Sequence, residues 1–211
     1  MPRTVLRLLL LSLVLQLAAC TVTALKPEIR DRLKSVSVDV QMPPKGVIVV
    51  APSGGALLLL GGPLLQGIVN ARTGLPEAYL EVLEKNKIDI REMFSSKASQ
   101  FLQARGIVVS SGARSADAVL RINIDQFGLA ETGGGFALLS SKRAPYFNVV
   151  FLLLDQQGRE IWGRRLVSQL DVKVPMDGME VQDYFLQPAQ LEALSRKVVD
   201  TMVDQAFADW K

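Results

Sequence analysis

Few residues in this sequence could carry nucleophilic or metal-binding chemistry. Cys20 is the only cysteine among 211 residues, and the chain contains no histidine. Zinc sites, Ser-His-Asp triads and Cys-His pairs are therefore excluded in their usual forms, because each needs imidazole groups or several thiolates. A single sulfur cannot form an intramolecular disulfide either. The thiol of Cys20 thus needs another explanation.

Serine and carboxylate chemistry is weakly indicated. Ser53 is followed by two glycines, but the chain lacks the histidine base of a serine hydrolase, and the segment lacks the lysine of a phosphate-binding loop. Several aspartates could in principle pair as they do in a glycosidase: Asp117, Asp125, Asp155, Asp171, Asp177 and Asp183. We interpret Asp117 and Asp155 as turn residues and Asp125 as part of a solvated strand face. We therefore expect no enzymatic activity, no metal and no cofactor.

The residues before Cys20 indicate its role. Two arginines precede an apolar run over residues 8–17 and then two alanines, which is the order of a secretory signal. The run is shorter than the roughly 20 residues that a membrane-spanning helix needs, so cleavage is favoured over a retained span. Residues 17–20, Leu-Ala-Ala-Cys, closely resemble the lipobox of bacterial lipoproteins. This resemblance implies cleavage before Cys20 and attachment of diacylglycerol and a further acyl chain such as palmitate; a plain secretory signal with an incidental cysteine is the alternative.

The location of the mature protein follows from the same resemblance. Thr21, where an aspartate would retain the protein, implies export to the outer membrane with the domain in the periplasm, and the inner membrane is the less favoured alternative. Of the 24 basic side chains, two lie within residues 1–19, which leaves 22 against 21 acidic side chains. Such a nearly neutral domain lacks the basic face that nucleic acid requires, so we expect a membrane partner and no nucleic acid.

Periodicity divides the chain into a signal peptide at residues 1–19, a lipidated tether at 20–34 and a single domain at 35–211. Alternating or apolar runs predict strands at residues 35–40, 107–109, 120–124, 147–154 and 160–170. Helical spacing predicts helices at residues 76–85, 89–105 and 188–210. This order predicts an α+β fold with a single, mostly antiparallel sheet and helices packed on one face.

An uncharged, glycine-rich stretch at residues 46–71 interrupts this pattern. A loop and short helix packed on the domain is the favoured interpretation, ahead of a surface that contacts a partner or the membrane. A true membrane span is the third, because prolines and glycine pairs break the apolar run. The candidate contact residues are Leu57, Leu58, Leu59, Leu60, Gly61 and Gly62. The glycine loop at residues 133–135 is a second candidate contact surface.

Three further groups have both a structural and a functional interpretation. Trp162 is expected to be a packing residue rather than a platform for a ligand. The basic pair Lys142 and Arg143, and the pair Arg164 and Arg165, could bind anionic lipid or glycan, although solvated surface charges are the commoner case.

Several segments together resemble a group of uncharacterised proteobacterial lipoproteins: Cys20 and residues 36–40, 88–90, 117–120 and 158–163, together with the glycine-rich interval. The order of the elements is also similar to that of small accessory lipoproteins such as the lipopolysaccharide-assembly lipoprotein and the YajG-type lipoproteins. These resemblances imply a non-enzymatic accessory lipoprotein that is anchored through Cys20 and binds another envelope component. The alternative is a carrier of lipid or of a small hydrophobic ligand, with an apolar pocket between the sheet and the helices.

Overall fold

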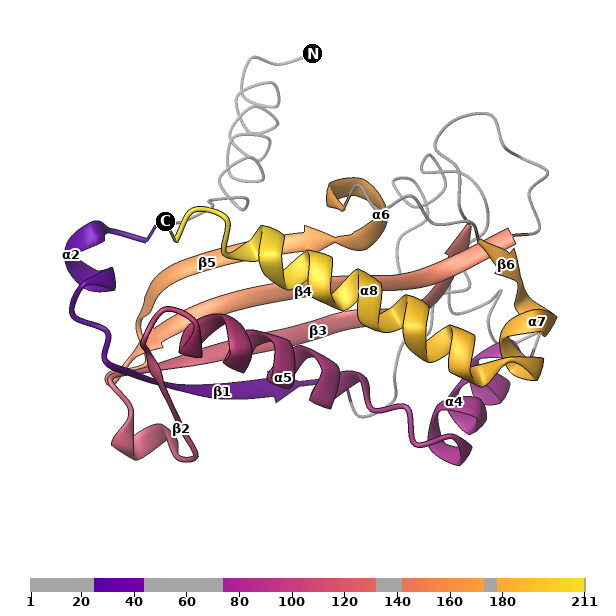
Figure 1. The fold of residues 1–211 in the computed structure, drawn as a ribbon, viewed down its shortest axis with the longest axis horizontal. Coiled ribbons are helices and arrows are strands. Elements are labelled where there is room, and N and C mark those ends of the chain that lie inside the picture. The colour runs from indigo at the N-terminus through magenta and orange to yellow at the C-terminus, as the bar shows by residue number, and fades with distance from the viewer. Residues whose placement is uncertain (1–24, 44–73, 132–141, 173–177, 211) are drawn as a thin grey trace, which may run out of the picture.

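The protein is an α+β structure in which helices cover one face of a six-stranded sheet. The computed structural model describes residues 25–43, 74–131, 142–172 and 178–210. Figure 1 shows the two long helices α5 (Ile90–Gln103) and α8 (Pro188–Ala206) lying side by side across the sheet. The predicted fold class and the placement of the helices on one face are confirmed.

The sheet is mixed, so the expectation of a mostly antiparallel sheet is wrong. Its main strands follow the order β2 (Val108–Ser110), β1 (Ser35–Gln41), β3 (Ala118–Glu131), β4 (Lys142–Asp155) and β5 (Glu160–Val167). β1 is parallel to both β2 and β3, whereas β4 is antiparallel to β3 and β5. A helical connection between β1 and β2 returns the chain to the starting end of β1, and such a crossover produces parallel neighbours.

Local sequence signals explain where the two long helices begin. Asp89 is the N-cap of α5 and accepts a hydrogen bond from the backbone N–H of Glu92 at 3.1 Å. Pro188 occupies the first turn of α8, where its missing N–H costs nothing. The predicted short helix is α4 (Leu75–Lys85), and the end of the tether forms one short helix, α2 (Pro27–Arg30). A 3₁₀ turn, η1 (Ala113–Ser115), precedes β3.

The strands predicted at residues 147–154 and 160–170 are confirmed as β4 and β5, which form an antiparallel hairpin, and the end of the second needs a correction. Gly158 lies in the turn with φ 76°, a left-handed conformation that glycine adopts at no steric cost. The second strand ends at Val167 rather than at residue 170, because the chain turns into the short helix α6 (Ser168–Asp171). Between α6 and α8 the described residues also form the strand β6 (Met179–Glu180), which pairs with β4, and the helix α7 (Val181–Leu186). The periodicity of the sequence predicts neither element.

Alternation along the strands sends apolar side chains toward the helices. Leu120 and Ile122 on β3, and Phe147 and Phe151 on β4, are fully buried on this face. At the end where α8 finishes, Phe207 contacts four other rings; these rings belong to Phe101, Phe151, Trp162 and Trp210, with centroids 4.5–6.1 Å away. Edge and stacked arrangements of this kind stabilise a core beyond the area that they bury. In the described ranges, no helix has the length and apolarity that crossing a membrane requires.

Candidate functional site

The residues that the sequence singles out as a site lie outside the described ranges. Cys20 precedes residue 25, and the contact candidates Leu57 to Leu60, Gly61 and Gly62 fall within residues 44–73. The glycine loop at residues 133–135 and Asp177 are also outside. Lipidation of Cys20 and contact through residues 57–62 therefore remain predictions.

The sheet face opposite the helices is where polar and apolar side chains mix. Arg121 on β3 pairs with Asp39 on β1 at 3.3 Å, and Arg165 on β5 pairs with Asp125 on β3 at 2.8 Å. All four side chains are more than one-third exposed, so each pair adds little to stability. The interpretation of Asp125 as a solvated strand residue is confirmed. These ion pairs make this part of the outer face polar.

A hollow of about 440 Å³ opens at one end of this outer face. Val119 of β3 and Leu154 of β4, which are neighbours in the strand register, form its apolar part. Arg114 of η1 and Arg121 of β3 contribute two guanidinium groups, and Asp155 contributes one carboxylate. The hollow therefore combines an apolar floor with three charged side chains.

The hairpin turn and η1 form the walls of the hollow and are connected to each other. The amide nitrogen of Gln156 donates to the backbone carbonyl of Ala116 at 3.3 Å, which ties the β4–β5 turn to the residue after η1. Both elements lie beside the beginning of β1, at the left end of the sheet in Figure 1, where α2 is also found. The hollow thus lies at the end of the domain where the tether enters.

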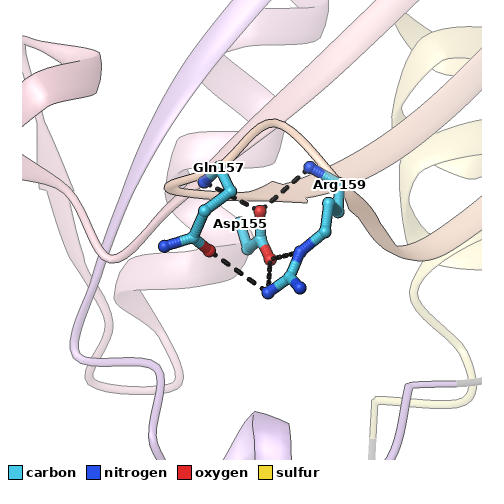
Figure 2. A network of polar contacts seen from close by, with 3 residues as sticks. All are labelled: Asp155, Gln157 and Arg159. Atoms are coloured by element: carbon cyan, nitrogen blue, oxygen red, sulfur yellow. Dashed lines mark hydrogen bonds and ion pairs between the residues drawn. The ribbon is translucent and has the colours of Figure 1, made fainter.

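The carboxylate of Asp155 is occupied by contacts within its own turn, as Figure 2 shows. Its oxygens accept hydrogen bonds from the backbone N–H groups of Gln157 and Arg159, each at 2.9 Å, and the Arg159 guanidinium lies 2.7 Å away. The hydrogen bond from the Arg159 N–H, together with the Arg159 guanidinium and the Gln157 N–H, lowers the pKa of Asp155 below its usual value of 3.8. Asp155 is therefore ionised and already neutralised by Arg159, which confirms its role as a turn residue.

Asp117 is a structural residue of the same end of the sheet. Its carboxylate accepts hydrogen bonds from the backbone N–H groups of Lys34 and Ser35 at 2.9 and 2.8 Å, which joins the start of β1 to the residue before β3. These hydrogen bonds lower the pKa of the Asp117 carboxyl below its usual value. Its expected turn role is confirmed.

We expect Asp117→Asn to lower the free energy of unfolding at neutral pH, because the neutral amide is a weaker acceptor for the two backbone N–H groups. Since the folded state lowers this pKa, the ionised form contributes stability above the unfolded value of 3.8, and the contribution disappears as the pH falls through the lower folded value. Urea unfolding of wild type and variant at a series of pH values measures the difference. The difference in free energy of unfolding between wild type and variant should be constant near neutral pH and shrink below about pH 4.

Asp125→Asn is the matched control for this substitution. It removes a carboxylate that pairs with an exposed arginine rather than with backbone N–H groups, so we expect a smaller loss of stability. If Asp117→Asn cost no more than Asp125→Asn at every pH, the connection between β1 and β3 through Asp117 would not stabilise the fold.

Of the candidate aspartates that the structure describes, four have a local structural partner: Asp117, Asp125, Asp155 and Asp171. Asp171 accepts a hydrogen bond from the backbone N–H of Val167 at 2.7 Å. Within the described ranges, no group of three or more acidic or cysteine side chains is arranged to hold a metal ion. The described carboxylates thus offer local hydrogen-bonding and ion-pairing roles rather than a paired-acid site.

The two basic pairs noted in the sequence do not form one patch. Arg164 points toward the helices, where it donates to the carbonyl of Ala206 at 3.4 Å and lies 3.6 Å from Asp209. Arg165 points to the opposite face, because successive strand residues alternate. Arg143 is half-buried at the other end of β4 from the hollow.

Arg114 and the aromatic residue Phe207 are the residues that sequence reasoning missed. Arg114 lies two residues after Gly112, and nothing in its immediate sequence places it beside a hairpin turn that is distant in the chain. Phe207 lies one position beyond the end of α8 and is fully buried. The apolar spacing that ends at Trp210 is the signal that could have found it.

The layer between sheet and helices, which the carrier alternative requires as a pocket, is occupied by aromatic rings in the described structure. The Phe94 ring lies 5.6 Å from that of Phe147 and 6.3 Å from that of Phe151. The hollow at Arg114 opens on the opposite face. No observation therefore favours a carrier with a pocket in this layer, and that function remains a prediction.

Comparisons with known proteins give structural likenesses only. No family model and no curated protein sequence matches the chain. The chain is similar to a minor lipoprotein from Acinetobacter baumannii, with 14% identity, a TM-score of 0.38 and coverage of 82% of this chain and 87% of that one. It is also similar to a Xanthomonas campestris protein of the DUF330 family, with 13% identity, a TM-score of 0.44 and coverage of 84% and 85%.

A third solved structure, a PelC dodecamer from Paraburkholderia phytofirmans, has 17% identity, a TM-score of 0.33 and coverage of 81% of this chain and 88% of that one. Bacterial lipoproteins are thus among the solved structures to which the chain is similar. Likeness to the lipopolysaccharide-assembly and YajG-type lipoproteins remains a prediction. Since all these TM-scores are below 0.5, we base the function on the residues of this chain.

Proposed function

We propose that this protein is a non-enzymatic accessory lipoprotein of the bacterial envelope, held at the periplasmic face of the outer membrane by lipid on Cys20, where it binds another envelope component. The lipobox at residues 17–20 is the observation that carries the proposal. One acyl chain binds a membrane only marginally, and several chains together do not dissociate on the working timescale. The domain is accordingly anchored rather than spanning.

The packing of the first described residues supports a short tether. Leu25 packs against the main core, and it lies five residues after Cys20. Five residues span at most about 18 Å when fully extended. The end of the domain that carries α2 is therefore held close to the lipid headgroups. The envelope component that the protein binds must lie within reach of the domain in this position.

A non-enzymatic role is supported by how the polar groups are used. The described carboxylates Asp117, Asp155 and Asp171 accept hydrogen bonds from backbone N–H groups, and Asp39 and Asp125 pair with arginines. Asp117, Asp155 and Asp171 are not available as a general acid or base without loss of these backbone hydrogen bonds. A binding function is compatible with these contacts, because it does not require an unpaired carboxylate.

The uncharged stretch at residues 46–71 is the proposed contact with the partner, through Leu57 to Leu60 and the following glycines. Apolar residues at the centre of an interface contribute most of its affinity. The test is affinity purification of the intact lipoprotein after crosslinking in cells, with proteins and lipids identified by mass spectrometry. We expect a specific envelope protein that is lost in Cys20→Ala and in a Leu58→Asp, Leu59→Asp double variant.

Leu170→Asp is the matched control, because Leu170 is 83% exposed and lies in the described domain, outside the proposed contact segment. It should leave the partner in place. An unchanged partner set in the Leu58, Leu59 variant would exclude this contact, and the absence of any specific partner from the wild type would exclude the accessory function.

A further inference from the structure

The charge distribution around the outer-face hollow favours an anion. The guanidinium of Arg114 makes no hydrogen bond or ion pair with any residue that the structure describes. Arg121 shares one contact with Asp39 at 3.3 Å and is 38% exposed. Asp155, the carboxylate in the lining, is neutralised by Arg159 at 2.7 Å. An anion entering the hollow would therefore meet Arg114 and Arg121 without displacing a strong ion pair.

The donors suit a phosphate in particular. A guanidinium presents N–H groups in a planar fork that matches two oxygens of a phosphate or carboxylate, and it is more weakly hydrated than an ammonium group. Arg114 and Arg121 come from different elements, η1 and β3, that are held together at one end of the sheet. Two such groups converging on one hollow could hold a single phosphate from two sides.

The floor of the hollow favours a ligand that is also apolar. Val119 and Leu154 face each other across the β3–β4 pair. Leu152 and Val150 alternate along β4 on the same face and are half-buried, so apolar surface continues away from the arginines. At about 440 Å³ the hollow lies within the range of about 300–1,000 Å³ that holds small ligands. A phosphate that carries acyl chains matches both parts.

The position of the hollow selects the source of that phosphate. Asp117 accepts hydrogen bonds from the N–H groups of Lys34 and Ser35, so the start of β3, beside the hollow, lies next to the last residue of the tether. We propose that Arg114 and Arg121 bind the phosphate of an anionic membrane lipid, with its first methylenes on Val119 and Leu154. This inference rests on the proposed anchoring through Cys20, which keeps headgroup phosphates at high effective concentration beside the domain.

The test uses the mature, lipidated protein reconstituted into phosphatidylcholine vesicles that contain either photoactivatable phosphatidylglycerol or photoactivatable phosphatidylcholine. After irradiation, mass spectrometry maps the lipid adducts. We expect phosphatidylglycerol to label the peptides that contain Val119 and Leu154 more strongly than phosphatidylcholine does. Arg114→Gln should lower this labelling about tenfold, which corresponds to about 1.4 kcal/mol. Adding Arg121→Gln should lower it further.

Arg165→Gln is the matched control. Arg165 lies on the same sheet face and pairs with an aspartate as Arg121 does, but it does not line the hollow. We expect phosphatidylglycerol to label Arg165→Gln as strongly as it labels the wild type. Arg114 makes no described contact that the fold depends on, so the single variant stays informative if the double variant proves unstable.

Three results would overturn the inference. Equal labelling of wild type and Arg114→Gln, with the protein floating with the vesicles, would overturn the headgroup site alone. Complete loss of labelling on adding millimolar inorganic phosphate would show that free phosphate suffices and would overturn the lipid as the ligand. A wild-type protein that does not float with the vesicles would overturn the anchoring and this inference with it.

Discussion

Replacing Val198 by aspartate is expected to leave little folded protein at neutral pH. Val198 lies on α8, is fully buried and belongs to the main hydrophobic core. An aspartate there has no partner, and burial raises the pKa of an unpaired carboxyl by up to about 3–5 units. At pH 7 the resulting penalty is about 4 kcal/mol, because it cannot exceed about 1.4 kcal/mol for each pH unit above the unfolded pKa of about 3.9. A domain of this size has only about 5–15 kcal/mol of stability. Urea unfolding followed by circular dichroism measures the loss.

The pH dependence distinguishes a buried charge from a general packing defect. Because the folded state would raise this pKa, the destabilisation is present at neutral pH and shrinks as the pH falls toward the unfolded value of about 3.9. We therefore expect the variant to regain part of its stability relative to wild type between about pH 7 and pH 5. A deficit that is the same at both pH values would indicate lost packing without a buried charge.

Ala193→Asp is the matched control on the same helix. It introduces the same charge at an exposed position, with Lys197 one turn away. We expect a change of less than about 0.5 kcal/mol. If Val198→Asp were as mild as this control, α8 would not pack on the sheet through the face that contains Val198.

This experiment tests a helix whose register could be predicted from the sequence. The apolar spacing predicts the face of α8 that packs on the sheet, formed by Leu191, Leu194, Val198, Met202, Ala206 and Trp210. Five of these six side chains are buried, and Leu194 is half-buried. The buried face is wider than predicted, because Val199 and Val203 are buried as well. A helix lying flat on a sheet buries a broader stripe than the spacing of one row of residues indicates.

The length of β3 could not be predicted from alternation. The apolar positions Leu120, Ile122 and Ile124 are confirmed as buried, but the strand continues to Glu131. Its register with β4 shifts between Ile124 and Gln126, so two polar residues follow in succession and the period-2 pattern breaks. Such a bulge inserts a residue without ending the strand, and a prediction that depends on strict alternation stops there.

The mixed pairing and the outer-face hollow depend on long-range geometry that leaves no local signal. Whether β1 lies parallel to β3 is decided by the path of the connection between them and not by the residues of either strand. The hollow forms only because the β4–β5 turn and η1 meet, through a hydrogen bond between Gln156 and Ala116. The sequence indicates each strand and turn separately, and the fold alone brings Arg114 beside Val119.

Trp162→Ala is expected to lower the free energy of unfolding by about 3–5 kcal/mol. The predicted packing role of Trp162 is confirmed: the side chain is fully buried, stacks on Phe207 at 5.2 Å with an interplanar angle of 12°, and meets Trp210 edge-on at 5.2 Å. Removing the indole leaves a cavity between β5 and the end of α8, and it also removes the donor to Asp209 at 3.4 Å.

Ile161→Ala is the control, because Ile161 is the preceding residue on β5 but is only half-buried. Its truncation should cost less than half as much, since less surface is removed from the interior. A double-mutant cycle of Trp162→Ala with Phe207→Ala should give a coupling of about 0.5–1.5 kcal/mol for the stacked pair. Equal decreases in the free energy of unfolding for Trp162→Ala and Ile161→Ala, with no coupling to Phe207, would mean that this aromatic cluster does not stabilise the packing of α8 on the sheet.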